Sequence, residues 1–374
     1  MGAASPLACR LVQDPAEWPA LRTHWQRLHA ATPQATPWQS YEFLHEWWLA
    51  MAGDRRLCLV VVMSDAEPCL ILPLQIGRSE MLGLRLRLLE PLGMPDDINR
   101  PRLALGTPDA AAMRCALESI WAMRAQWDAI RLDEHENDDA ELQALREFAA
   151  AHGLGYRQAP LHACPYLDLR RSWPEFLESR GDRLRRNLRA AQRKLEARGA
   201  VRLVEHSSPA EFPAAFDRLM DIHVRSWKQV ERVGLCQSAR YRDFYRRFAL
   251  DMTARGAARI LLLYCGDVPV AGTIAFTSAG TYYSAQIAHD DGYSAASPGT
   301  LLESMELERL LNEGGFTEFD FLGAALNNKL RWTDTVRETC RVFLFRKGWR
   351  NLLIDTYYFS VKPRLKALSK PRPT

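Results

Sequence analysis

The sequence predicts an α+β protein made of two similar halves, each a mostly antiparallel sheet with helices packed on it. Two observations carry this prediction. The chain has 374 residues, a length that fits two domains at roughly 100–200 residues each. One order of segments, namely helix, β-meander, loop, helix and strand, occurs twice along the chain, which indicates duplicated domains. We expect these domains at residues 1–165 and 166–374.

The first half begins with a helix that Ser40 can cap and whose apolar residues follow helical spacing as far as Met51. Turn residues and apolar runs then predict strands, a loop and two further helices. These are strands at Leu57–Met63, Cys69–Ile76 and Met81–Leu89, the loop Glu90–Arg102, a helix near Asp109–Gln126, a strand at Asp128–Leu132 and a helix near Asp138–His152.

The second half repeats this order after a linking segment at Pro160–Trp173. Helices are predicted near Ala210–Gln229 and Ala239–Arg255, strands at Arg259–Cys265, Val268–Phe276 and Thr281–Ala288, the polar loop at His289–Ser297, a helix from Pro298 to Gly314, strands at Phe316–Leu322 and Arg341–Arg346, and a last helix from about Trp349.

Composition excludes several classes of protein. Hydrophobic residues make up 47% and charged residues 25%, which rules out disordered, collagen-like and low-complexity chains. A net charge of +4 is too small to indicate a nucleic-acid binder. The eight cysteines show neither metal-ligand spacing nor a disulfide framework, so we expect no metal and a reducing compartment. With no signal peptide and only strand-sized apolar runs, the sequence predicts a cytoplasmic protein without a transmembrane segment.

The junction HDDGYSAASPGT at His289–Thr300 is a candidate anion site, because a strand ends there and a helix begins. Pro298 suits the first helical turn, Ser297 can act as N-cap, and Gly299 lets a ligand approach the backbone. The free N–H groups of Gly299, Thr300 and Leu301 would then face an anion such as a pyrophosphate. An ordinary capped helix start is the alternative. In the first half, Gly106-Thr107-Pro108-Asp109 instead places a carboxylate at the helix start, where Asp109 would cap the helix and repel a phosphate.

The segment RGDRLRRNLRAAQRKLEARG at Arg180–Gly199 predicts a basic amphipathic helix. Arg185, Arg189 and Arg193 form an i, i+4 row on one of its faces. This row is either a solvated helix face or a cradle for an anionic substrate, tRNA or an anionic membrane surface.

A few titratable residues are candidates for proton transfer or substrate binding. His289 and Asp290 follow a strand beside the proposed anion site, where a base can accept a proton from an amine, although a polar turn is an equal alternative. Asp320 lies in an apolar strand and must be either paired or functional. His223 shares a helical face with large apolar residues, which favours a core histidine over a catalytic one, and it stays a candidate for substrate binding.

Taken together, GDVPVAGTIAF, the run TYYSAQIAHDDGYSAASPGTLLESMELERLLNEG and the FDFLG strand followed by Lys329 resemble the GNAT acyltransferase superfamily. With TPWQSYEFLHEWW and the basic helix, the chain is similar to the tandem-GNAT branch that includes FemAB-type transferases and CelD/BcsL-like proteins of polysaccharide synthesis. The resemblance implies two tandem GNAT-like domains, each a mixed, mostly antiparallel sheet flanked by helices, of which the first is degenerate.

The resemblance also implies that acetyl-CoA or another acyl-CoA binds at Ser297–Thr300, with its pantetheine arm along the strand Ser284–Ala288. A backbone N–H near Ile287 or Ala288 would polarise the thioester carbonyl. Lys329 would contact substrate, but Asn328 replaces the Tyr that often precedes this lysine, so a role for that Tyr does not carry over.

Three functions follow as expectations. The first is acyl-CoA-dependent N-acyl transfer to an amine-bearing sugar or an envelope or exopolysaccharide precursor, with peripheral association with a membrane or a polysaccharide synthase as one consequence. The second is Fem-type transfer of an amino acid from charged tRNA, the sole case in which tRNA is a partner. The third is a non-catalytic assembly factor for polysaccharide machinery.

Overall fold

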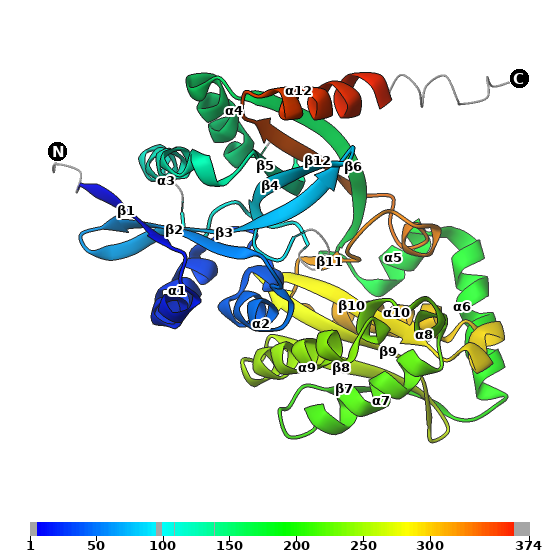
Figure 1. The fold of residues 1–374 in the computed structure, drawn as a ribbon. Coiled ribbons are helices and arrows are strands. Elements are labelled where there is room, and N and C mark those ends of the chain that lie inside the picture. Colours follow the sequence, from blue (N-terminus) through cyan, green and yellow to red (C-terminus); the bar gives the residue numbers. More distant parts are fainter. Residues whose placement is uncertain (1–5, 95–98, 108, 138, 363–374) are drawn as a thin grey trace, which may run out of the picture. The chain divides into compact units, whose positions relative to one another are not determined.

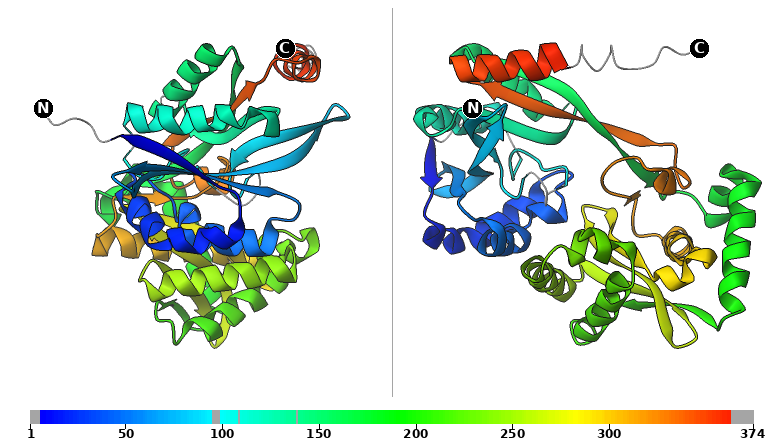
Figure 2. Two further views of the ribbon diagram at one scale, coloured as in Figure 1. Left: turned by 60° about the vertical axis from the view of Figure 1, so that its left-hand side comes forward. Right: turned by 45° about the vertical axis from the view of Figure 1, so that its right-hand side comes forward.

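The computed structural model describes residues 6–94, 99–107, 109–137 and 139–362. The chain folds into two compact units. Unit 1 comprises the described residues of Met1–Leu44, Ala52–His162 and Glu338–Thr374, and unit 2 comprises His45–Met51 and Ala163–Arg337. Figures 1 and 2 show the elements of both units along the chain.

Unit 1 contains a sheet with strand order β1-β2-β3-β4-β5-β12 and the helices that pack on it. Its elements are β1 (Leu7–Val12), η1 (Pro15–Leu21), α1 (Arg22–Ala31), η2 (Pro37–Gln39), β2 (Arg56–Ser64), β3 (Glu67–Met81), β4 (Leu84–Pro91), α3 (Ala110–Ala122), η3 (Arg124–Gln126), β5 (Ala129–Glu136), α4 (Ala140–His152), α12 (Trp349–Thr356) and η6 (Tyr357–Val361).

Unit 2 contains a second sheet with strand order β6-β11-β10-β9-β8-β7. Its elements are α5 (Trp173–Ser179), α6 (Gly181–Glu196), β7 (Val201–His206), α7 (Phe212–Val224), α8 (Trp227–Glu231), η4 (Gly234–Cys236), α9 (Ala239–Ala254), β8 (Ala258–Cys265), β9 (Val268–Ser278), β10 (Thr281–His289), η5 (Asp291–Ala296), α10 (Pro298–Glu313), β11 (Glu318–Asp320) and α11 (Asn327–Leu330). Three further elements, α2 (Tyr41–Met51), β6 (Gly155–Asp168) and β12 (Val336–Phe345), begin in one unit and end in the other.

The repeat predicted from the sequence is confirmed by the strand pairing. In unit 1, β2, β3 and β4 form an antiparallel meander, and β5 then pairs parallel to β4. In unit 2, β8, β9 and β10 form the same meander, and β11 pairs parallel to β10. A helix, α3 or α10, joins each meander to its parallel strand, as parallel pairing requires. The predicted α+β fold with mixed, mostly antiparallel sheets is therefore correct.

In each unit one strand comes from an unexpected part of the chain. β12 pairs antiparallel with β5 in unit 1, while the end of β6 pairs with β11 in unit 2. Residues from Glu338 onward therefore group with unit 1, whereas the sequence predicted one domain at 166–374. The expected link Pro160–Trp173 continues as strand to Asp168 before α5 begins.

Helices cover both faces of the unit 2 sheet. Alternate side chains of each strand line the two faces, since successive side chains point to opposite sides. On one face Leu261 and Leu263 pack with Leu302 and Leu307 of α10. On the other face α7 lies against β9 so closely that a Cβ added at Gly272 would be 2.7 Å from a methyl carbon of Leu219. Glycine at this position therefore sets how near α7 approaches the strands that carry the site.

Within the described part of the chain, no helix combines the length and apolar character needed to cross a bilayer.

Candidate functional site

The candidate site of unit 2 begins at an irregularity in β10. The register between β9 and β10 shifts between Ala285 and Ala288, and Gln286 lies in the bulge with a left-handed φ of 52°. Such a bulge bends a strand and turns its neighbouring backbone groups away from the regular ladder. On the other side of β10, the described pairing with β11 covers only Thr281–Tyr283. Because β11 ends at Asp320, its pairing does not reach Ile287 and Ala288.

His223 holds this bulge in place from α7. The side chain is fully buried, and its Nε2 donates a hydrogen bond of 2.8 Å to the carbonyl oxygen of Gln286. Burial, with a smaller contribution from the charge of Lys228, lowers the pKa of His223 to about 3, so the ring is neutral. The structure therefore places His223 beneath the bulge and outside the pockets described below, as expected for a core histidine.

The helix start after β10 forms the second part of the site. Pro298 is the first residue of α10, as predicted. Ser297 stands at the N-cap position in a left-handed conformation with a φ of 52°, and its side chain makes no capping hydrogen bond, contrary to the expected role. The N–H groups of Gly299 and Thr300 belong to the first turn, where no carbonyl lies one turn earlier to accept them. A Cβ added at Gly299 would lie 3.4 Å from Nδ1 of His289.

These two parts enclose a pocket of about 320 Å³, which we call the β10–α10 pocket. The sequence predicted half of its lining, and the other half was not proposed as site residues. The predicted residues are Ile287, Ala288, His289, Ser297, Gly299 and Thr300, and the additional ones are Trp227, Lys228, Ser294, Glu303, Asn328 and Arg331.

Two titratable groups of the β10–α10 pocket, the buried Glu303 and the half-buried Lys228, were not predicted from the sequence. Glu303 of α10 accepts a hydrogen bond of 3.0 Å from the indole nitrogen of Trp332, and burial raises its pKa to about 7. Burial lowers the pKa of Lys228 to about 8. Both groups therefore change charge near neutral pH. The local sequence did not indicate that Glu303 faces a pocket, because its acids are spaced as in an ordinary helix, LLESMELERLLNE.

His289 lies in the pocket where β10 ends. Its side chain is 32% exposed, and its Nε2 lies 3.9 Å from a carboxylate oxygen of Asp291. Burial lowers the pKa of His289, while Asp291 and Asp290 oppose this effect. A neutral imidazole with an accessible ring is suited to accept a proton.

The two predicted carboxylates do not line this pocket. Asp290 caps η5 by accepting from the N–H of Gly292 at 2.8 Å, and it pairs with Arg225 at 2.6 Å. Asp320 is fully buried, accepts from the N–H of Leu322 at 2.7 Å and lies 3.6 Å from Nη1 of Arg337. The sequence left open whether Asp320 is paired or functional, and the structure shows it paired.

Arg331 lines the pocket, whereas Lys329, expected to contact substrate, does not. The ammonium of Lys329 donates to the carbonyl oxygens of Leu322 and Ala324, so it clamps the loop after β11 rather than entering the pocket. Burial also lowers its pKa. Arg331, two residues later, lines the pocket and donates from Nη1 to the hydroxyl of Thr300. The pocket cation beside the helix start is therefore Arg331.

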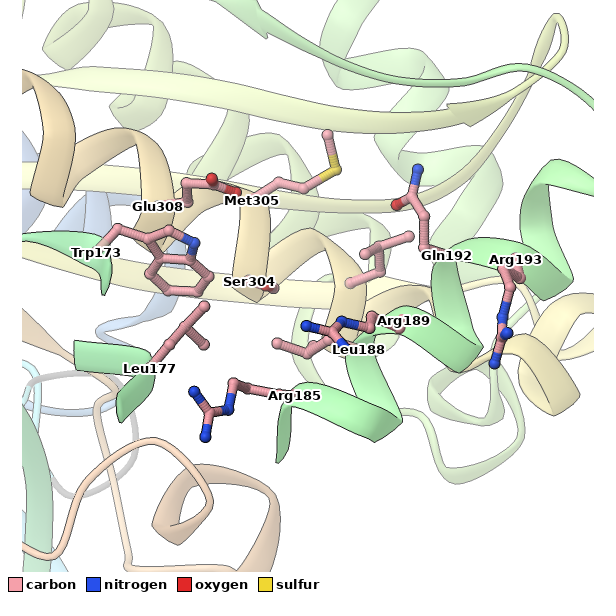
Figure 3. A pocket seen from close by; sticks show the side chains of 11 residues that line it. Trp173, Leu177, Arg185, Leu188, Arg189, Gln192, Arg193, Ser304, Met305 and Glu308 are labelled. Atoms are coloured by element: carbon pink, nitrogen blue, oxygen red, sulfur yellow. The ribbon is translucent and has the colours of Figure 1, made fainter. Parts of the chain in front are cut away.

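The arginine row lines a second cavity, of about 580 Å³, which we call the α6–α10 groove. Figure 3 shows Arg185, Arg189 and Arg193 extending from α6, with side chains of α5 and α10 around the same space. Arg185 pairs with Asp182, whereas no ion pair holds Arg189 or Arg193 within the described residues. Leu301 also lines this groove, and its N–H, expected to be free for an anion, donates instead to the carbonyl oxygen of Ser297 at 3.2 Å. The remaining lining is mainly apolar and consists of Trp173, Leu177, Leu188, Gln192, Ser304, Met305 and Glu308.

The corresponding helix start of unit 1 differs as the sequence predicted. Asp109 is the N-cap of α3, and its carboxylate accepts from the N–H of Ala112 at 2.6 Å. A carboxylate already satisfies the donors that an anion would need there. Pro108 lies outside the described residues. No group of three or more His, Cys, Asp or Glu side chains is arranged to hold a metal ion in the described ranges.

Comparison with known proteins confirms the superfamily. Residues 182–330 match the family model described as the acetyltransferase (GNAT) domain, and these residues include both the β10–α10 pocket and the arginine row. This segment is therefore a GNAT domain, as the sequence motifs indicated. No curated protein matches the chain.

Solved structures share the fold over most of the chain. The crystal structure of FemX aligns with a TM-score of 0.59 at 13% identity, covering 90% of this chain and 98% of that one. The C-terminal domain of a putative lysylphosphatidylglycerol synthetase from Agrobacterium fabrum aligns with a TM-score of 0.55 at 12% identity, covering 92% and 97%. L-PGS from Bacillus licheniformis gives 0.54 at 13% identity, covering 92% and 95%. At such identities the likeness shows the common fold alone.

Proposed function

We propose that the chain is an acyl-CoA-dependent N-acyltransferase whose acceptor is an amine-bearing sugar or a related envelope or exopolysaccharide precursor. One observation carries the proposal: the GNAT domain retains a pocket that joins the bulged end of β10 to the first turn of α10. Its volume of about 320 Å³ lies at the lower end of the range for small-molecule sites.

The donor's phosphates fit the start of α10. The first-turn N–H groups of Gly299 and Thr300 and the guanidinium of Arg331 supply positive electrostatic potential at one point of the pocket. The loop Ala295-Ala296-Ser297 supplies no basic side chain, so Arg331 takes the part that a basic loop would play. Acetyl-CoA or another acyl-CoA is therefore the donor class that we propose, bound as a substrate.

The reaction needs an amine nitrogen to bond to the acyl carbon while the carbon–sulfur bond breaks. One proton leaves the nitrogen, and the departing thiolate takes up one proton. A backbone N–H at Ile287 or Ala288, beyond the end of the β10–β11 pairing, would polarise the thioester carbonyl. His289 and Glu303 both line the pocket and are the two side chains suited to accept the amine proton. Alignment of the two substrates supplies much of the remaining rate.

The α6–α10 groove is the site that we propose for an anionic part of a substrate. Arg189 and Arg193 are available for a phosphate or carboxylate, and the apolar floor can receive a less polar portion. Leu301 of the groove and Thr300 of the pocket are adjacent on α10, so one extended substrate can contact both cavities.

A second candidate is Fem-type transfer of an amino acid from charged tRNA. The likeness to FemX over 90% of the chain and the arginine row favour it. A non-catalytic assembly factor is less consistent with a pocket that keeps titratable groups with pKa values of about 7 and 8.

A thermal-shift screen against acetyl-CoA, longer acyl-CoAs, charged tRNA and UDP-sugars tests the proposal. A ligand at about a hundred times its Kd raises the free energy of unfolding by about 2.7 kcal/mol. We expect stabilisation by an acyl-CoA. Stabilisation by charged tRNA alone would select the second candidate, and no response to any donor would contradict acyl transfer.

A further inference from the structure

Helix α12 and its continuation η6 carry an apolar stripe on the side that faces solvent. On the inner side, Ile354 is fully buried against a cluster of β4, β5 and β12 side chains, with Tyr358 and Phe359 packed beside it. On the outer side, Trp349, Leu352 and Leu353 are 63%, 65% and 52% exposed. Their i, i+3, i+4 spacing places them on one helical face. Clustered exposed apolar side chains of this kind mark an interaction surface.

A cationic basin borders this stripe. A cavity of about 790 Å³ in unit 1 is lined by Arg78, Arg85 and Arg87 of the β3–β4 hairpin and by Arg350 of α12. Arg87 is neutralised by Asp128 at 2.8 Å. Glu80 also lines the basin and pairs with Arg85 in the strand register. Within the described residues no ion pair involves Arg78 or Arg350, so positive charge remains available for an anion.

The basin and the stripe form one surface. Arg350 directly follows Trp349, and its guanidinium lies 5.5 Å from the centre of that indole ring. Met81 and Leu84 of the same β3–β4 hairpin pack against the cluster that receives Ile354, which ties the hairpin to α12. Leu82 between them is 45% exposed.

The charge that lines the basin is net positive, because four arginines stand against Glu80 and Asp128. Asp355, the acid within α12, is paired with Arg157 at 2.6 Å. After Asp355 the described chain contains no acidic residue, and Lys362 adds a positive charge.

We propose that this surface binds an anionic lipid bilayer, with α12 lying in the plane of the interface. Trp349, Leu352 and Leu353 insert among the headgroups, and the arginine basin binds a lipid phosphate. An apolar stripe that includes Trp and is flanked by basic residues has the pattern of an interfacial helix. Basic residues near an anionic leaflet add to the attraction. A symmetric dimer through the same surface would instead bring two cationic basins together.

Co-sedimentation with phosphatidylglycerol-containing and pure phosphatidylcholine vesicles tests the proposal. We expect the full chain to bind the anionic vesicles, to bind the zwitterionic ones at least tenfold more weakly, and to be released by salt. Failure to bind anionic vesicles, or equal binding to both, would overturn the proposal. This readout involves neither acyl donor nor acceptor, so it is independent of the proposed enzymatic function.

Two variants assign the binding to this surface. We expect Leu352→Gln with Leu353→Gln to weaken partitioning about tenfold. Arg78→Gln with Arg350→Gln should weaken it about tenfold or more, since each basic residue contributes roughly fivefold. Leu49→Gln with Val268→Gln is the control, because these residues are 59% and 43% exposed elsewhere. An equal loss in the control would overturn the assignment. So would a wild-type dimer, seen by analytical ultracentrifugation, that the Leu352/Leu353 variant dissociates.

Discussion

At the residue scale, the pocket depends on burial that the sequence does not display. His289 was predictable because it lies where a strand ends, shortly before a helix start. Glu303 was not, because its pKa of about 7 arises from burial by residues distant in sequence, Trp332 among them. Asp290 and, behind it, Asp320 were also candidate bases, yet Arg225 and Arg337 pair with them. Only the tertiary structure separates a paired carboxylate from an available one.

The pH dependence of kcat/KM distinguishes the two candidate bases. A base must lose its proton before it acts, so kcat/KM rises with pH through the pKa of that base. Burial lowers the pKa of His289 below its usual 6.5 and raises that of Glu303 to about 7. We expect the variant of the true base, His289→Ala or Glu303→Gln, to lose the rise and about 10²–10⁴-fold of the rate. If both variants keep the wild-type profile, solvent takes the proton.

The raised pKa of Glu303 also predicts a pH dependence of stability. The folded state binds the proton more tightly than the unfolded state, where the pKa is about 4.5. The free energy of unfolding therefore falls as pH rises from about 4.5 to about 7 and levels off above that. Glu303→Gln removes this contribution, so it should gain on the order of 3 kcal/mol relative to wild type between pH 4.5 and pH 8. Urea unfolding at the two pH values measures the difference. If the free energies of unfolding of the variant and the wild type differ by the same amount at both pH values, Glu303 is solvated.

Gly299 permits a direct test of the donor site. Gly299→Asp places a carboxylate at the helix start, where it repels phosphate, and we expect acetyl-CoA binding to fall at least a hundredfold by calorimetry. Gly299→Ala is the matched control. Its Cβ would lie at an ordinary contact distance of 3.4 Å from His289, so binding should change little. If the aspartate variant remains folded and binds like wild type, the phosphates bind elsewhere.

At the element scale, local sequence signals found most strands and helices, and they failed where partners are distant. The unit 2 meander lies where turn residues placed it, with β8 at Ala258–Cys265 and β9 at Val268–Ser278. The edge strands β1 and β7 were missed, because each is a short run with weak alternation. The bulge at Gln286 was also missed, because its carbonyl oxygen is held by a hydrogen bond from His223 of α7, which is distant in sequence.

The arginine row of α6 was predicted correctly as a row, and its role stays a prediction. Replacing Arg189 and Arg193 by Gln should weaken binding of an anionic substrate and flatten its salt dependence. The melting temperature should change little, because exposed charges contribute little to stability. Arg183→Gln with Arg186→Gln is the matched control, since these residues belong to the same helix but do not line the groove. A large loss of stability with unchanged binding would make the row structural.

At the scale of the whole molecule, the duplication was visible in the sequence, but the strand exchange was not. Each half contains its own meander, helix and parallel strand, and these follow local patterns. Two further strand pairs, β12 with β5 and the end of β6 with β11, join strands that are separated by long stretches of chain. No periodicity of the sequence encodes such pairing, so the predicted boundary at residue 166 assigned β12 to the second half.

The duplication leads to a prediction of stoichiometry, since the two helix starts are not equivalent. In unit 2 the first turn of α10 offers N–H donors and Arg331, whereas in unit 1 the carboxylate of Asp109 already accepts from Ala112. Isothermal titration calorimetry should therefore give one acetyl-CoA per chain for the wild type. Asp109→Asn keeps the cap and removes the charge, so it should leave the stoichiometry at one. Gly299→Asp should abolish binding altogether rather than halve it. Two equivalent sites in the wild type, or half the heat remaining in the Gly299 variant, would mean that the first unit also binds the donor.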